Sequence, residues 1–344
     1  MKKTILWWGR FDENYSRNRI LRQQMKRLGY QIIDFKPLIS NLGYLQAFIS
    51  VRFIPSLIWV PCFRHRDLQS AAKWAAKNKI SIIFDPLISS WDKKINEQSK
   101  YKKTSKESLF LKKNESELFN KSNLLVADTE AHKRFFIKKF KIPEEKIFVI
   151  NVGAEEKNFF PNKKVVVSNQ EILFYGSFLE LHGVKVIIDA AKILKDESIK
   201  WTLIGEFQKI KVEDLPLNIT FESSMNIKKL VERIHKATLL LGIFSNSEKA
   251  NNVIPNKVYQ SLACGKTVIT RYADAYPQSF FKKNMGIFFV KPNDPMVLAQ
   301  QVLKVINDKK LIEKTNKLAR STFENFYSEE KIRKQVHALF KRLL

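Results

Sequence analysis

The chain has 344 residues, which suits two domains of about 150 residues each. Hydrophobic residues make up 44% of it, including 26 Phe and 6 Trp, and this content excludes a globally disordered chain. The two cysteines, Cys62 and Cys264, are too few for a disulfide framework or a cysteine-based zinc site, so we expect both to be reduced thiols.

The formal net charge is +27, and the excess of basic residues is larger in the first half. Residues 1–170 carry 33 Lys and Arg against 16 Asp and Glu, whereas residues 171–344 carry 28 against 18. Such a balance favours an anionic partner, namely nucleic acid, anionic lipid or an anionic small molecule. A lysine-rich composition without any function is the alternative explanation.

Strand-like and helix-like segments alternate through the first half of the chain. The N-terminal MKKTILWWGRFDEN has only a short apolar run followed by acidic residues, which predicts a first strand and no signal peptide. The predicted strands are 4–8, 31–35, 56–60, 80–84, 124–127 and 147–150. The predicted helices are 14–28, 67–77 and 130–140, and the lysine-rich segment 93–113 is either a loop or a solvated helix.

The longest apolar stretch, 38–61, is interrupted by charge and by proline, so no membrane-spanning helix is expected. It predicts a helix followed by a buried strand. Alternatively, one face of that helix contacts a bilayer surface. The residues of that face are Leu42, Leu45, Phe48, Ile49 and Phe53.

The alternation restarts after a predicted linker at 161–169. The predicted strands are 171–175, 201–204, 219–221, 238–244 and 267–270. The predicted helices are 184–194, 227–237, 255–264 and 294–307, followed by a basic amphipathic helix at 328–344. This β/α order predicts two parallel, doubly wound sheets with a ligand cleft between the two halves.

The stretch NNVIPNKVYQSLACGKTVIT, at 251–270, is the most informative part of the sequence. Pro255 stands where a first helical residue is expected, and Gly265 stands just past the helix end. The helix follows an apolar strand, so its free N–H groups form a ready site for a diphosphate, to which Lys257 adds a positive charge. The alternative is an ordinary helix with a solvated lysine.

A second stretch, FYGSFLELHG at 174–183, places Gly176 after a strand and Gly183 at the start of a helix. Glycine allows the backbone to approach a ligand closely. His182 precedes the helix start, where it either donates to a phosphate oxygen or has a purely structural place.

These two stretches, together with the basic C-terminal helix, resemble the retaining glycosyltransferases of family 4, which have the GT-B fold. The segment 151–155 (NVGAE), followed by Phe160 and Pro161, resembles that family's passage into its second domain. The resemblance covers about 124–344 well and the first 120 residues weakly. It implies two Rossmann-like domains facing across a cleft: 1–163 for the acceptor and 164–323 for the nucleotide sugar, with 324–344 packing back on the first.

The resemblance implies a donor site in the second domain. The residues it assigns there are Gly176, Ser177, His182, Gly183, Asn252, Pro255, Asn256, Lys257, Val258 and Gln260. Ser177 and His182 replace the family's usual Arg and Lys, and Asn252 and Gln260 replace its usual pair of Glu. These departures indicate either a different donor or lost activity.

In the first domain, Gly9 and Arg10 follow the first strand and are expected to face the diphosphate. His65 and Asp85 each follow a strand, so both are candidates for facing the acceptor. Asp85 is the candidate for binding the acceptor hydroxyl, and a turn at Asp85–Pro86 is the structural alternative. Asp128 and Thr129 resemble a helix N-cap.

No Asp-x-Asp, Walker or GxGxxG motif occurs, so no metal and no cofactor are expected apart from a donor substrate linked to UDP or GDP. We expect a retaining, hexosyltransferase-type enzyme of polysaccharide biosynthesis that acts on a cell-envelope glycan or polyprenyl-linked acceptor. Its expected location is cytoplasmic and peripheral, on the anionic inner face of the plasma membrane, without a nucleic-acid partner. The alternatives are a catalytically inactive GT-B subunit, a sugar-nucleotide epimerase of the same fold and a basic nucleic-acid-binding protein.

Overall fold

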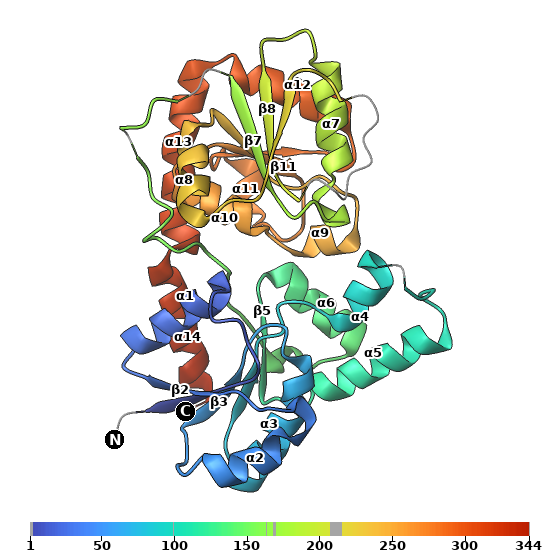
Figure 1. Cartoon of the computed structure of the whole chain (residues 1–344), viewed down its shortest axis with the longest axis vertical. Helices are drawn as coiled ribbons and strands as arrows, with labels where there is room; N and C mark the ends of the chain where they lie inside the picture. The colour runs from blue at the N-terminus through green and yellow to red at the C-terminus, as the bar shows by residue number, and fades with distance from the viewer. Residues whose placement is uncertain (1–2, 99, 163, 168–169, 207–214, 344) are drawn as a thin grey trace. The chain divides into compact units, whose positions relative to one another are not determined.

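A computed structural model describes residues 3–98, 100–162, 164–167, 170–206 and 215–343. The chain falls into two compact units (Figure 1). Unit 1 comprises Met1–Val152 and Glu329–Leu344, and unit 2 comprises Gly153–Ser328. The predicted domain boundary at 163, and positions 168–169 of the predicted linker, lie outside the described residues.

Unit 1 is built on a six-stranded parallel sheet in the order β2-β1-β3-β4-β5-β6. Its strands are β1 (Thr4–Trp8), β2 (Gln31–Phe35), β3 (Leu57–Val60), β4 (Ile82–Phe84), β5 (Leu124–Ala127) and β6 (Ile147–Val149). β2 lies on one side of β1, and β3 and the later strands lie on the other, so the strand order reverses at β1. The loops at the carboxyl ends of β1 and β3 therefore diverge there.

Helices cover both faces of this sheet. They are α1 (Ser16–Arg27), α2 (Gly43–Ser50), α3 (His65–Asn78), α4 (Ser90–Asp92), α5 (Lys106–Phe119), α6 (Glu130–Phe140) and α14 (Glu329–Leu343). Side chains on β1 alternate between two hydrophobic clusters, because successive strand residues point to opposite faces. Leu6 and Trp8 pack with residues of α3, α5 and α6, whereas Ile5 and Trp7 pack with residues of α1 and α14.

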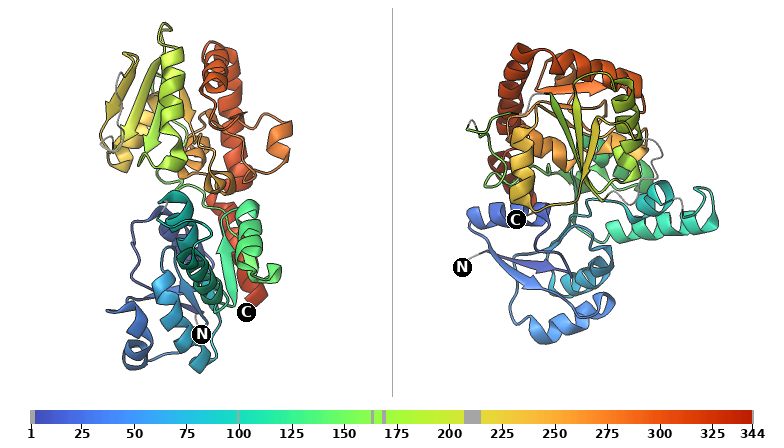
Figure 2. Two further views of the ribbon diagram at one scale, coloured as in Figure 1. Left: turned by 90° about the vertical axis from the view of Figure 1, so that its right-hand side faces the viewer. Right: turned by 45° about the horizontal axis from the view of Figure 1, so that its top comes forward.

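The C-terminal helix α14 is part of unit 1 and lies beside α1 (Figure 2). Its Val336 and Phe340 belong to the same buried cluster as Trp59 of β3. Gln335 is tied to Asn151 by two hydrogen bonds, one donated by the Asn151 backbone N–H at 3.1 Å and one donated by Gln335 Nε2 at 2.8 Å. The last helix of the sequence therefore completes the core of the first unit.

Unit 2 is built on a second six-stranded parallel sheet, in the order β12-β11-β10-β7-β8-β9. Its strands are β7 (Glu171–Gly176), β8 (Lys200–Gly205), β9 (Ile219–Glu222), β10 (Leu239–Leu241), β11 (Val268–Arg271) and β12 (Ile287–Val290). In sequence terms this is the 3-2-1-4-5-6 order of dinucleotide-binding sheets, whose strand order reverses between β7 and β10. The predicted doubly wound α/β class is confirmed for both units.

The helices of unit 2 flank its sheet on both sides (Figure 1). They are α7 (Val184–Ile193), α8 (Ile227–Lys236), α9 (Glu248–Asn252), α10 (Asn256–Ala263), α11 (Ser279–Lys282), α12 (Pro295–Ile306) and α13 (Lys309–Thr322). α7 and α12 share a hydrophobic cluster with β7 and β8. Within the described residues, no helix is both long and apolar enough to cross a membrane.

Candidate functional site

The loops that leave β7 and β10 meet where the strand order of unit 2 reverses. Gly176 ends β7, and Gly183, with φ of 64°, comes directly before α7. A Cβ atom at Gly183 would lie 2.6 Å from the backbone nitrogen of Ser245, which follows β10, so only glycine fits this contact. The sequence thus brings the two loops into backbone contact at the usual ligand position of such sheets.

Lys257, in the first turn of α10, is buried without a hydrogen-bond partner among the described residues. Its Nζ lies 4.0 Å from the centre of the Phe174 ring and 3.1 Å from the position of a Cβ on Gly176. The ring face offers the ammonium partial electrostatic compensation. Burial lowers the pKa of Lys257 well below its ordinary value. An anion here would supply the partner that this cation lacks.

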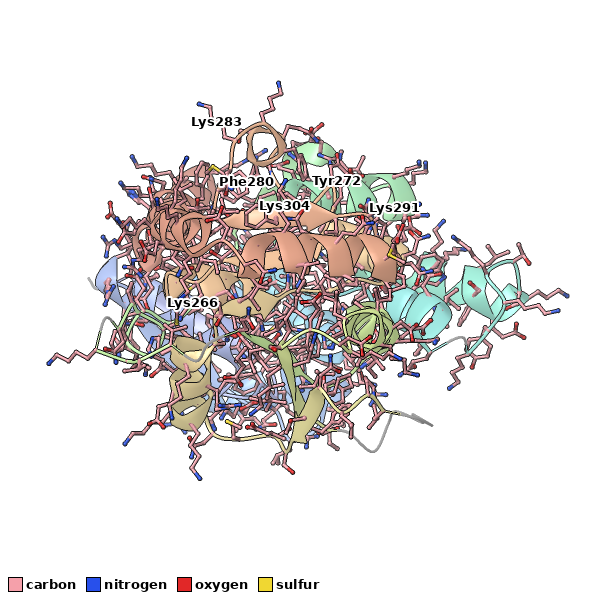
Figure 3. The ribbon with its side chains drawn as sticks, turned by 90° about the horizontal axis from the view of Figure 1, so that it is seen from above. Lys266, Tyr272, Phe280, Lys283, Lys291 and Lys304 are labelled. Carbon is pink, nitrogen blue, oxygen red and sulfur yellow. The ribbon has the colours of Figure 1, made fainter. Side chains whose placement is uncertain are left out.

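Another buried lysine of the same unit, unlike Lys257, has hydrogen-bond partners. Lys266, labelled in Figure 3, donates from Nζ to the carbonyl oxygens of His235 and Ala237, at 2.7 and 2.8 Å. Buried charges without partners cost free energy, so a cation that the fold leaves without one points to a ligand. Lys257 is therefore the strongest feature of the site.

His182 lies beside this lysine and is neutral. Its ring is buried, and the Cβ position of Gly176 lies 3.0 Å from its Cε1 atom. Burial, and then the positive charges of Lys257 and Lys249, lower the pKa of His182 to about 2. Its Nδ1 has no hydrogen-bond partner among the described residues, so a neutral ring can donate one hydrogen bond to a ligand oxygen. Protonated His182, one way to replace the family's lysine, does not fit this environment.

The loop after β7 turns its polar residue outward. Ser177 is exposed, whereas Phe178 is buried and stacks on Phe174 with ring centres 5.9 Å apart. Phe178 has φ of 51°, a left-handed conformation that is uncommon for a bulky residue. The position at which the family usually has arginine therefore carries an exposed serine, and Lys257 is the cation nearest Gly176.

The first turn of α10 holds the other predicted donor residues. Pro255 is the N-cap of α10, one position before the place predicted for it, and its carbonyl accepts from Val258 N–H at 2.9 Å. Asn256 is exposed, and its N–H and that of Lys257 precede the first intrahelical bonds. A helix start of this kind favours negative charge.

Gln260, one turn further along α10, is oriented by a tyrosine that no motif in the sequence marks. The hydroxyl of Tyr175 donates to Gln260 Oε1 at 3.0 Å. Burial raises the pKa of Tyr175 well above its ordinary value, so it remains a hydrogen-bond donor. Gln260 can therefore offer a ligand its amide Nε2 as a donor, while Oε1 keeps one further lone pair as an acceptor.

Asn252 is the last residue of α9, a short helix whose neighbourhood is held by Arg271. The Arg271 guanidinium donates to the carbonyl of Ser245 at 2.6 Å and to Asn251 Oδ1 at 3.4 Å. Asn251 Nδ2 donates in turn to Asp274 Oδ2 at 2.8 Å. Arg271 comes at the end of β11, and its role in fixing this loop was not visible from sequence spacing.

In unit 1, Gly9 and Arg10 lie where the strand order reverses. Gly9, with φ of 142°, donates to Phe35 O at 2.9 Å, and a Cβ there would lie 2.9 Å from Arg64 Cγ. Arg10 is exposed, and its Nη1 donates to the carbonyl of Leu38 at 3.4 Å. Both residues are thus at the carboxyl end of β1, as the sequence predicts.

Asp85 forms a buried ion pair with Arg17. Its oxygens accept from Arg17 Nε at 2.7 Å and Nη2 at 3.0 Å, and neither side chain is more than 1% exposed. Burial opposes the charge on Arg17, but Asp85 beside it outweighs burial and raises the pKa of the guanidinium. Because both carboxylate oxygens are engaged inside the core, the geometry gives Asp85 a structural place and no exposed oxygen for an acceptor hydroxyl.

His65 is the first residue of α3, the helix that follows β3. Its Nε2 lies 3.0 Å from the carbonyl of Ile88 and 3.3 Å from Glu115 Oε1. Glu115 also accepts from the N–H groups of Ser90 and Trp91. His65 and Asp85 therefore have separate partners, and the described structure does not bring them together.

His182, Lys257 and Gln260 therefore converge with the two glycines in unit 2. Among the described residues, no group of three His, Cys, Asp or Glu side chains is arranged to hold a metal ion.

Comparison with known proteins bears on the same part of the chain. Residues 155–322 match the family described as "Glycosyl transferases group 1". No curated protein matches the sequence. The structure is similar to that of HepE from Anabaena, solved in complex with UDP and glucose, with a TM-score of 0.74, 14% identity and full coverage of both chains.

Two further solved structures are similar over nearly the whole chain. A sucrose-phosphate synthase from Thermosynechococcus elongatus has a TM-score of 0.75 and 12% identity, with 99% of each chain covered. A glycosyltransferase from Rickettsia africae has a TM-score of 0.74 and 17% identity, with 99% of this chain and 98% of that chain covered. Residues 155–322 therefore match the group 1 glycosyl transferases, and the chain has the GT-B fold; the match and the fold together support glycosyltransferase activity.

Proposed function

We propose that the chain transfers a sugar from a UDP-linked donor, with retention of configuration and without a metal ion, as a member of glycosyltransferase family 4. The observation that carries the donor site is the buried Lys257 ammonium, which faces Gly176 and has no hydrogen-bond partner among the described residues. UDP is chosen over GDP because the similar Anabaena protein was solved with UDP-glucose.

In the proposed complex, the diphosphate lies against Gly176 and Gly183, where backbone atoms can approach closely. Lys257 and the first N–H groups of α10 neutralise its charge, and the neutral His182 ring donates one hydrogen bond. These groups are fixed before the reaction, so they stabilise the charge that develops on the departing diphosphate at little reorganisation cost. The protein thereby supplies the stabilisation that a metal ion supplies in other transferases.

Gln260 is proposed to orient the nucleoside. With Oε1 held by Tyr175, its Nε2 donates to a ribose hydroxyl oxygen, whereas the glutamate usual in the family accepts from such a hydroxyl. This neutral hydrogen bond is weaker than the charge-assisted one that a glutamate would make. Asn252 is proposed to lie near the donor sugar.

The acceptor is proposed to be a cell-envelope glycan or polyprenyl-linked intermediate at an anionic membrane surface, in polysaccharide biosynthesis. The excess of Lys and Arg supports this, because the more basic half of the chain is the one assigned to the acceptor. The departing diphosphate assists deprotonation of the acceptor hydroxyl on the face that it leaves, which gives retention.

The test is nucleotide release from UDP-, GDP-, ADP- and CMP-linked sugars, in the presence of EDTA and of lipid extracts as acceptor source. Release of UDP with an unchanged anomeric configuration in the product, read by NMR, is the expected result. Release that requires a divalent metal, or an inverted product, contradicts the proposal. Binding of UDP without turnover in any extract would instead favour an inactive subunit.

A further inference from the structure

Helix α2 buries small residues and exposes most of its large apolar ones, which is the reverse of the usual arrangement. Gly43 and Ala47, four residues apart on one face, are buried, and a Cβ on Gly43 would lie 3.0 Å from Ser70 Oγ of α3. Three large apolar side chains of α2, Leu45, Phe48 and Ile49, are exposed, whereas Tyr44 is half-buried and packs against the core of unit 1. A helix of a globular protein normally buries its large apolar residues, so an inverted one indicates a surface with another partner.

The exposed apolar surface extends beyond the helix on both sides. Seven large apolar side chains within 38–54 are each at least 42% exposed. These residues, called the α2 surface below, are Leu38, Ile39, Leu42, Leu45, Phe48, Ile49 and Ile54. Phe53, which the sequence assigned to the same face, is instead half-buried and packs against the core of unit 1.

Lysines of α3 flank the α2 surface. Figure 1 shows α2 beside α3, and Lys73 Nζ lies 5.0 Å from the ring centre of Tyr44, while Lys77 Nζ lies 4.2 Å from that of Phe48. Arg52 is exposed just after α2. Cations are thus held at the rim of the apolar residues, with their ammonium groups against aromatic rings.

The stretch of sequence around the α2 surface has almost no acidic residues. Residues 36–84 carry seven Lys and Arg but a single acidic residue, Asp67, and Asp67 is buried. No exposed carboxylate of this stretch would therefore repel an anionic partner. An apolar face with a basic rim and no exposed acid matches an anionic lipid bilayer, which offers acyl chains beneath phosphate headgroups.

We infer that the α2 surface is the membrane-docking site of this protein, with its apolar residues in the headgroup and acyl boundary and Lys73, Lys77 and Arg52 at the lipid phosphates. The inference deepens the proposed membrane location and does not depend on the donor chemistry in unit 2. A second copy of the chain fits less well, because two such basic rims would repel each other.

The test is flotation of the full-length protein with vesicles, comparing phosphatidylglycerol mixed with phosphatidylcholine against phosphatidylcholine alone, at low and high salt. The double variant Leu45→Asp/Ile49→Asp removes the apolar contact, and Leu109→Asp/Phe110→Asp is the matched control on α5, where both residues are also exposed. UDP binding is measured in parallel on every sample.

The wild type and the α5 control are expected to float with anionic vesicles at low salt, and the α2 variant is expected to bind at least tenfold more weakly. Each of Lys73→Gln and Lys77→Gln should weaken binding about fivefold, from about 1 kcal/mol per basic residue at the lipid surface. Equal binding by the α2 variant and the wild type, or no wild-type binding at low salt, overturns the inference.

A wild-type dimer that the α2 variant converts to monomer, without vesicle binding, also overturns the inference in favour of a second copy. Vesicle binding without UDP binding would refute the proposed donor site while leaving the α2 surface standing. UDP binding without vesicle binding gives the opposite result, so the two failures are distinguishable.

Discussion

The Nζ atom of Lys257 lies 4.0 Å from the centre of the Phe174 ring, and no acceptor among the described residues takes a hydrogen bond from it. A buried amine of this kind lowers the stability of the ligand-free protein and becomes favourable when an anion arrives. This relationship connects the fold of unit 2 to the proposed binding of a nucleotide diphosphate.

Lys257→Met should therefore separate stability from binding. The variant keeps an unbranched side chain but removes the desolvated amine, so the ligand-free protein should be as stable as the wild type or more stable, by up to about 2 kcal/mol. Its affinity for UDP should fall at least tenfold. Thermal unfolding and calorimetric titration measure the two effects, with Lys291→Met as control because Lys291 is an exposed lysine of the same unit. A destabilised variant with unchanged affinity would contradict the assignment.

The pH dependence of UDP binding should follow the lysine. Burial lowers the pKa of Lys257 in the free protein, so the ammonium loses its proton at a pH well below 10.5, its ordinary pKa. Above the lowered pKa, binding of the diphosphate must take up a proton, so affinity should fall as pH rises, by up to tenfold per pH unit. Titrations at pH 7 to 10 test this, and the slope should be absent in Lys257→Met. A wild-type affinity that is constant over this range would show that Lys257 does not contact the anion.

His182 should contribute to the loss of folding stability at acidic pH. Its pKa is lowered from 6.5 to about 2, so below pH 6.5 the unfolded chain binds a proton that the folded chain does not. This contribution to stability is complete above pH 6.5 and is lost progressively as the pH falls. The folding equilibrium constant decreases by up to tenfold per pH unit. His182→Gln should lose less stability than the wild type between pH 7 and 5 in denaturant titrations. Parallel pH profiles of the two proteins would refute the buried neutral histidine.

Tyr175 should act on nucleotide binding through Gln260. Tyr175→Phe removes the donor at 3.0 Å, and its cost to stability should be about 1 kcal/mol, the usual net value of one hydrogen bond. UDP affinity should fall a few-fold because Gln260 is no longer oriented. Gln260→Ala should have the larger effect on affinity, and the double variant should match it, since Tyr175 acts only through Gln260. Additive losses of affinity in calorimetry would instead mean that Tyr175 contacts the nucleotide itself.

The buried ion pair of unit 1 should be structural. Arg17→Met leaves Asp85 without its partner inside the core and should destabilise the protein by about 3–5 kcal/mol. Arg17→Met/Asp85→Leu should restore part of that loss, because it removes both charges. Urea unfolding measures both variants. If the double variant folds but transfers no sugar to any acceptor, Asp85 would return as a candidate for the acceptor site.

Much of the fold could be predicted because strand signals were local. Val126 and its neighbours form a short apolar run between polar segments, and β5 has the predicted bounds, as do β1 and β2. The strand β12 (Ile287–Val290) and the helix α13 (Lys309–Thr322) were not predicted. β12 is a short apolar run without period-2 alternation, and α13 is lysine-rich, with a polar surface that dominates its composition.

The site was predictable only in part, because its chemistry depends on distant contacts. The glycines and Lys257 could be found from their place at strand and helix ends. The neutral state of His182 comes from burial beside Lys257, and the burial of Asp85 comes from Arg17, which is 68 positions away. The orientation of Gln260 depends on Tyr175, 85 positions earlier, and no local pattern indicates that bond.

The most direct test of the donor site is calorimetric titration of the wild type and Lys257→Met with UDP, in EDTA, at pH 7.5. We expect a one-to-one complex of the wild type without metal and at least tenfold weaker binding by the variant, with the unfolding temperature of the ligand-free variant not lowered. Equal affinities in the two proteins, or no UDP binding by the folded wild type, would contradict the claim that this buried lysine holds the diphosphate of the donor.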